Sequence, residues 1–300
     1  MKTSFLGLEN MKIAVFSDLH GRIFLALKLV ERLQRERNIK IDLILQCGDV
    51  GIFPNLDQLD KATLKHAKHD PTELGFHRYF IKPQQGLKAL FNKLAADLVC
   101  VRGNHEDHEF LNQLEAQTGR PRFAVDCYQR IFICKTGKLQ TFQIDDAHIN
   151  IVGIGRIGLA AHKKISTNQK YIQLYEKAAL ETLKKHSKVK QEGIDILITH
   201  DSPLDFVDKG FGMSEIRDFL MSHQPIYHFF GHTGTPYHLQ LFDNNITQSC
   251  KIAELTWGKD GLLPYGCMVL IDWQNTFDNQ IEVIEDNWLK EYTQESWEYL

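Results

Sequence analysis

The chain has 300 residues and a formal net charge of -3, with 43% hydrophobic and 24% charged residues. This composition excludes disorder, collagen-like repeats and nucleic-acid binding through bulk positive charge. The length allows two domains or one large layered domain, and it suffices to bury a core without disulfides or a structural metal. The six cysteines form no C-x-x-C pair and no stretch approaches eighteen apolar residues, so we expect a reduced, cytoplasmic protein that spans no membrane.

The first part of the chain alternates short apolar runs with segments of helical spacing. The apolar runs predict strands at 12–17, 41–47 and 96–101. Helical spacing covers 22–37 and most of 55–96, where Pro71 and Pro83 are breaks. Strands joined by helices in this way are typical of an α/β sheet.

The later part of the chain is richer in predicted strands. These strands span 132–134, 139–144, 148–154, 194–199 and 226–230, and a long amphipathic helix is predicted at 171–186. Residues 238–284 read as further short strands separated by turns. Because no linker, repeat or low-complexity stretch interrupts the pattern, we expect one domain over 1–300, with its motifs in 11–240 and a β-rich completion and C-terminal tail in 241–300.

Polar side chains follow five of the predicted strands at the point where each strand ends. They are Asp18 with His20, Asp49, Asn104 with His105, His200, and His232. Ligands of open α/β sheets bind beyond the carboxyl ends of the strands. Carboxylate, amide and imidazole groups suit divalent metals, and one carboxylate shared by two ions makes a two-metal site for phosphoester hydrolysis. Each residue alone could be a helix cap or a structural histidine, but together they favour a metal site.

The same residues stand in the order D-x-H, G-D, G-N-H-[ED], H and G-H-x-H along the chain. This order resembles the pattern of the calcineurin-like metallophosphoesterases, and the resemblance covers residues 12 to about 240. It implies an α/β fold in which two mixed sheets, flanked by helices, form a four-layer α/β/β/α sandwich.

The resemblance also implies two divalent metal ions, which could be Mn, Fe or Zn. The metal ligands that it implies are Asp18 and His20 for the first ion, Asp49 as the bridge, and Asn104, His200 and His232 for the second. The family's counterpart of His105 lies over the substrate and stabilises or protonates the leaving oxygen, a role open to imidazole near neutral pH. We also expect Arg22 and Arg156 to bind the substrate. Glu106 is equally well explained as an acid in the first turn of a helix.

One position departs from the pattern of the family. Gly234 stands where a second histidine would complete the shell of the first metal, and His238 is the possible substitute. In the spacing of its motifs the chain looks most like the RNA lariat-debranching enzymes, although those enzymes have cysteine where this chain has Asp18. The resemblance therefore implies weaker binding of the first metal and leaves the substrate open.

We interpret the chain as a metal-dependent phosphoester hydrolase that acts on a phosphorylated small molecule, a nucleotide or RNA, with no obligate protein partner. Monoester and diester substrates both stay open, and the debranching-like spacing makes an RNA 2',5'-phosphodiesterase one alternative. A second alternative is a scaffold that keeps the fold without turnover. A third is a dinucleotide-binding protein, because Gly153 to Gly158 matches G-x-G-x-x-G and Glu176 follows at the distance of a ribose partner.

Overall fold

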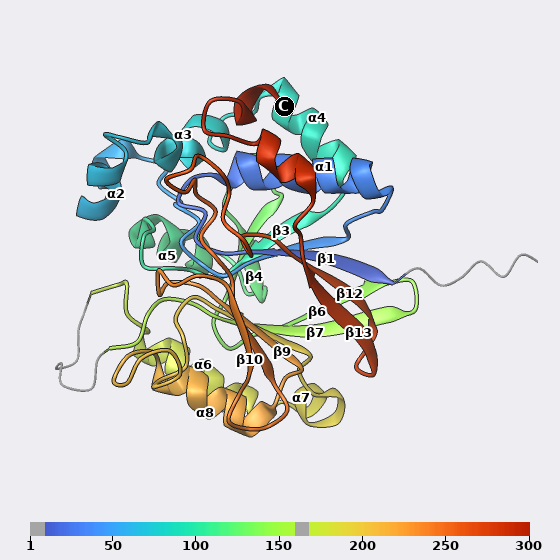
Figure 1. The fold of residues 1–300 in the computed structure, drawn as a ribbon. Coiled ribbons are helices and arrows are strands. Elements are labelled where there is room, and N and C mark those ends of the chain that lie inside the picture. The colour runs from blue at the N-terminus through green and yellow to red at the C-terminus, as the bar shows by residue number, and fades with distance from the viewer. Residues whose placement is uncertain (1–9, 160–167) are drawn as a thin grey trace, which may run out of the picture.

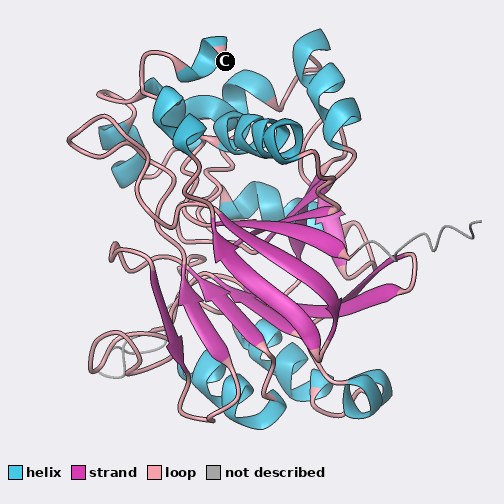
Figure 2. Cartoon of the chain, turned by 45° about the vertical axis from the view of Figure 1, so that its right-hand side comes forward, coloured by secondary structure: helices cyan, strands magenta, loops and turns pink. Residues whose placement is uncertain are grey.

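The computed structural model describes residues 10–159 and 168–300, which form two mixed β-sheets packed face to face. Helices cover the outer face of each sheet, so four layers are stacked in the order helix, sheet, sheet, helix (Figure 1 and Figure 2). The α/β/β/α sandwich expected from the sequence is therefore confirmed. None of the described helices is long and apolar enough to cross a membrane.

The first sheet has seven strands in the order β13-β12-β1-β2-β3-β5-β4. Its strands are β1 (Met11–Phe16), β2 (Leu43–Gln46), β3 (Asp97–Cys100), β4 (Arg122–Ala124), β5 (Ile131–Cys134), β12 (Val269–Asn275) and β13 (Asp278–Val283). β1, β2, β3 and β5 run parallel to one another, whereas β12, β13 and β4 add antiparallel edges. Three parallel strands of this sheet therefore end at one edge, each followed by predicted site residues.

The second sheet has six strands in the order β10-β11-β9-β8-β7-β6. Its strands are β6 (Leu139–Ile144), β7 (Ala147–Ile154), β8 (Ile196–Thr199), β9 (Tyr227–Phe230), β10 (His238–Leu241) and β11 (Gln248–Lys251). β7, β8, β9 and β11 are parallel. An isolated bridge between Ser17 and Glu254 joins the two sheets where β1 ends, and this brings the strand-end loops of both sheets together.

Helices of the first outer layer pack on the first sheet. They are α1 (Ile23–Arg37), α2 (Lys61–His66), α3 (Gly75–Tyr79), α4 (Gln85–Leu94) and α5 (His108–Ala116). The other layer holds α6 (Leu174–Leu183), α7 (Ser187–Glu192) and α8 (Ser214–His223). One strand faces two cores: Ala14 and Phe16 of β1 pack with α1, whereas Ile13 and Val15 meet the second sheet. This alternation follows from the two-residue period of a strand.

The structure corrects one predicted helical segment and confirms another. The helix expected over 171–186 is two helices, because α6 ends at Leu183 and α7 begins at Ser187. The segment 55–96 is helical with breaks, as predicted: Pro71 lies between α2 and α3, and Pro83 lies between α3 and α4. In 171–186 the amphipathic pattern continues across an interruption that the tertiary packing imposes.

The segment after residue 241 contributes strands to both sheets and then docks as a tail. Its last two 3-10 helices are Asn287–Glu291 and Trp297–Tyr299. Trp288 and Trp297 are buried in the core beside α1, and Lys28 donates hydrogen bonds to the carbonyl oxygens of Trp297 and Glu298. The tail is therefore part of the packed fold.

Candidate metal centre

Five loops from the two sheets meet at one place. Asp18, Asp49 and Asn104 follow β1, β2 and β3 of the first sheet, while His200 and His232 follow β8 and β9 of the second. Most of these side chains border a cavity of about 460 Å³. The residues that line it are Asp18, His20, Asp49, His105, His232, Gly234, Thr235, Pro236, Lys251, Ala253, Glu254, Thr256, Pro264 and Tyr265. The topology thus brings together residues that are far apart in the sequence.

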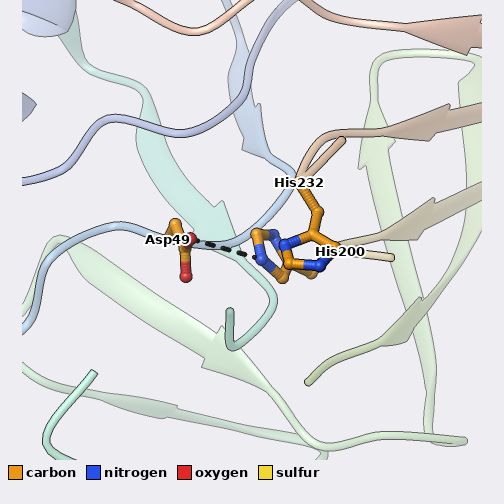
Figure 3. A group of neighbouring side chains, drawn as sticks. All are labelled: Asp49, His200 and His232. Atoms are coloured by element: carbon orange, nitrogen blue, oxygen red, sulfur yellow. Dashed lines mark ion pairs between the residues drawn. The ribbon is translucent and has the colours of Figure 1, made fainter. Parts of the chain in front are cut away.

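Two groups of possible metal ligands share one carboxylate. One group is Asp18, His20 and Asp49, and the other is Asp49, His200 and His232. Within each group, one ligand atom from every residue lies within 4.8 Å of the others. Figure 3 shows the second group, in which the imidazoles of His200 and His232 lie side by side and face Asp49.

The two oxygens of the Asp49 carboxylate face different partners. Oδ1 accepts hydrogen bonds from the backbone N–H groups of Asn104 and His105, both at 2.7 Å. Oδ2 lies 3.4 Å from Nε2 of His200 and faces the cluster. Burial by itself would raise the pKa of Asp49, but the neighbouring imidazoles, His200 first, hold that pKa well below its ordinary range. Asp49 is therefore a fixed anion with one oxygen directed at the cluster.

Contacts at both ring nitrogens fix the orientation of His200. Its Nδ1 lies 3.0 Å from the carbonyl oxygen of Cys47, and its Nε2 lies 2.9 Å from Oδ1 of Asn104. A carbonyl at Nδ1 fixes the tautomer that leaves the Nε2 lone pair for a cation. Oδ1 of Asn104 and Nε2 of His200 thus lie next to each other as two atoms that could bind the same cation.

Four of the cluster's residues adopt a backbone conformation that side chains rarely take. Asp18, His20, Asp49 and His232 have φ values of 46°, 42°, 53° and 64°. Such left-handed residues cost about 1–3 kcal/mol each and collect at functional sites. Hydrogen bonds support this conformation, since the His232 backbone N–H donates to Oδ1 of Asp18 at 3.1 Å. The cluster is a strained arrangement that the surrounding structure maintains.

The donor set fits divalent cations. Asp18 and Asp49 are 5% and 2% exposed, so two carboxylates lie close together with little water to screen them. Buried carboxylates of this kind need a compensating positive charge. Oxygen and imidazole nitrogen donors suit ions such as Mn²⁺, Fe²⁺ and Zn²⁺. The structure thus brings all six predicted ligands, including Asn104, into one cluster.

His105 borders the same cavity and is anchored by an acid that sequence reasoning missed. Its Nδ1 lies 2.8 Å from Oδ2 of Asp60, while Oδ1 of Asp60 caps α2 by accepting from the N–H groups of Ala62 and Thr63. Burial alone would lower the pKa of His105, but the hydrogen bond to Asp60 and the charge of Asp49 raise it. Asp60 lies within the segment read as helical, so the only available signal was its suitability as a cap.

Glu106 is not in the first turn of a helix, which corrects one of the sequence interpretations. Helix α5 begins at His108. The buried carboxylate of Glu106 accepts hydrogen bonds from the backbone N–H groups of Val50 at 2.9 Å and Ile52 at 2.7 Å. It therefore ties the loop after β3 to the loop after β2.

The two arginines expected to bind substrate are engaged elsewhere. The guanidinium of Arg22 is 2.6 Å from Asp70 and 3.4 Å from Glu73. Arg156 is fully buried, and its Nε is 2.9 Å from Glu176. Neither lines the cavity at the cluster, because nearby carboxylates hold both side chains within the protein.

The glycine-rich segment does not have the geometry of a dinucleotide fingerprint. Gly153 lies in β7, and no helix begins within the described residues 155–159, where the fingerprint would open one. Glu176 also closes a capping box at the start of α6. The segment instead passes close to neighbouring backbone: an added side chain at Gly158 would meet Gly212 and Met213.

The structure also locates the position where the motif lacks its second histidine. Gly234 borders the cavity, and a Cβ added there would meet no atom within 4 Å. His238 is exposed on β10, and its Nε2 lies 2.9 Å from Gln240. His238 is not among the residues that line the cavity, so the structure does not bring it to the first group of ligands.

A model of the family described as calcineurin-like phosphoesterase matches residues 11–236. Among solved structures, TT1561 of Thermus thermophilus is similar with 13% identity and a TM-score of 0.51, covering 91% of this chain and 99% of that chain. A novel phosphatase from Mycoplasma pneumoniae is similar with 11% identity and a TM-score of 0.46, covering 94% of this chain and 96% of that chain. No curated protein matches. At such low identity, the likeness to the Thermus structure concerns the fold alone.

Proposed function

The chain belongs to the calcineurin-like phosphoesterase family and is a metal-dependent phosphoester hydrolase, and on this premise we propose that it works with two divalent cations that share Asp49. The observation that carries the proposal is the pair of ligand groups with Asp49 in common. In this proposal Asp18 and His20 complete the first site. Asn104, His200 and His232 complete the second.

Each residue then has a defined task. Bound cations would hold the phosphoryl oxygens and supply an activated water for in-line attack. Asp49 keeps one oxygen for the cations because backbone N–H groups occupy the other. His105 has its Nδ1 fixed by Asp60, which leaves Nε2 to donate a proton to the leaving oxygen.

The substrate in this proposal is a phosphate ester of a small molecule, a nucleotide or RNA. The cavity has room for an organic leaving group, since its volume is about 460 Å³ and Pro236, Pro264 and the half-exposed Tyr265 also line it. A panel of esters defines the class. It contains nitrophenyl phosphate as monoester, bis-nitrophenyl phosphate as diester, nucleotides, and 2',5'-linked RNA.

The test begins with protein stripped of metal and reloaded with Mn²⁺, Fe²⁺ or Zn²⁺. We expect hydrolysis of at least one ester, its loss on chelation, and a loss of at least about 100-fold in Asp49→Asn. Asp195→Asn is the matched control, because Asp195 is a buried carboxylate that accepts a backbone N–H at the opposite end of β8. The proposal fails if the loaded protein hydrolyses no ester in the panel, or if Asp49→Asn retains activity.

A further inference from the structure

A buried lysine borders the cavity at the metal centre. Lys251 ends β11 and is 2% exposed, yet its side chain helps to line the cavity together with Asp18 and Gly234. Among the described residues that line this cavity, it is the one lysine or arginine. No function described so far uses it.

Lys251 has few partners for a buried charge. Its Nζ donates to the carbonyl oxygen of Ile252 at 2.6 Å. Within residues 10–159 and 168–300, no carboxylate oxygen lies within 4.0 Å of its Nζ. An ammonium group has three donors, and a buried charge is costly unless it is paired. Nζ therefore keeps donor hydrogens for an acceptor that a substrate could supply.

Gly234, which lines the same cavity, explains why a basic side chain is useful here. Gly234 contributes no side chain, so the first ligand group has Asp18, His20 and Asp49 but no second imidazole. With fewer fixed ligands, a cation on this side would itself be bound less firmly by the protein, so a second basic group would help to hold a phosphoryl oxygen. Lys251 supplies a basic side chain on the wall of the same cavity.

We propose that Lys251 is a phosphate-binding residue, whose ammonium group donates a hydrogen bond to a non-bridging oxygen of the substrate beside the first ligand group. This inference rests on the proposed function, and it specifies how the anionic part of the substrate is recognised. A charge-assisted hydrogen bond made to both substrate and transition state strengthens binding more than it speeds the chemical step.

The test compares Lys251→Met with wild type, both loaded with Mn²⁺, using inorganic phosphate as the probe. We expect the Kd of phosphate from calorimetry to rise roughly 10- to 100-fold. KM should rise similarly for the preferred ester, while kcat changes less than about threefold. Metal content, measured by mass spectrometry, should match wild type. Replacing a buried, unpaired charge by an apolar side chain of similar volume should leave the Tm of the metal-free protein equal or higher.

Lys28→Met is the matched control, because Lys28 also donates to backbone carbonyls but lies against the C-terminal tail. Lys251→Gln removes the charge and keeps a donor for Ile252, so it replaces Lys251→Met if that variant does not fold. Unchanged phosphate affinity would overturn the inference, as would lost metal or a lowered Tm with unchanged affinity, since both indicate a structural role. The phosphate titration needs no turnover, so it decides the role of Lys251 even if no ester is hydrolysed.

Discussion

Replacing Asp60 by serine should slow the reaction through His105 alone. Serine keeps an oxygen that can cap α2, the task now performed by Oδ1 of Asp60. It is too short to replace Oδ2, which lies 2.8 Å from His105 Nδ1. The hydrogen bond to His105 and those at the helix start hold the pKa of Asp60 at about 2 against the effect of burial, so Asp60 is an anion at neutral pH.

Two usual magnitudes set the range of the loss in kcat that we expect for Asp60→Ser. Losing a partner that orients a working side chain usually costs about 10- to 100-fold. Losing the proton donor itself usually costs about 10²- to 10⁴-fold. If Asp60 acts only by orienting His105, the loss in Asp60→Ser cannot exceed the loss in His105→Ala.

The assay measures kcat and KM at saturating metal for wild type, Asp60→Ser, His105→Ala and the double variant. We expect kcat to fall about 10- to 100-fold in Asp60→Ser, and the double variant to equal His105→Ala because the two residues act as one unit. Asn55→Ser is the control, since Asn55 caps the 3-10 helix Leu56–Gln58 and has no hydrogen bond to His105. If the loss in the double variant equals the product of the two single losses, the orienting role of Asp60 is refuted. A loss of metal in Asp60→Ser would refute it as well.

Three further predictions follow from the site and the core. Gly103→Ala should lose metal and activity with the fold retained, because its Cβ would collide with the side chain and backbone of Asp49; metal analysis and circular dichroism test this, and a fully loaded variant would contradict it. Gly234→His should tighten one metal site in calorimetry but cost about 1 kcal/mol of stability, since φ is +63° there; unchanged metal affinity would show that the imidazole does not reach. Burial lowers the pKa of His228 to about 3. Below the unfolded-state pKa near 6.5, the unfolded chain binds a proton that the folded protein does not, so the free energy of unfolding is largest above pH 6.5 and falls as the pH falls toward 3. The decrease is at most about 1.4 kcal/mol per pH unit. Urea unfolding of His228→Gln between pH 6 and 4 should show a shallower decline than wild type, and parallel curves would contradict the assignment.

Residues placed by the ends of parallel strands could be located from the sequence. Asp49 comes three residues after β2 and His200 comes directly after β8, and parallel strands that end at one edge bring such residues together. Most parallel strands of both sheets could likewise be predicted from their apolar runs. The roles of these residues remain predictions, although their meeting in one cluster was foreseeable.

Residues placed by tertiary packing could not be located in this way. Arg22 looks available in the sequence, but the fold brings Asp70 and Glu73 to its guanidinium. Asp60 reaches His105 across 45 residues, through a helix start that no motif marks. Lys251 ends β11, a strand of mixed polarity, so no pattern in the sequence marks it.

The pairing of β1 with β12 has a consequence for how the chain folds during synthesis. Val15 pairs with Val269, and one edge of β1 therefore lacks its partner until roughly 250 more residues have been made. At typical elongation rates this interval is about 10 to 50 s. An apolar strand edge left open for so long invites pairing with other chains. Chains that stop between residues 240 and 268 would contain every predicted metal ligand, and we nevertheless expect them to aggregate.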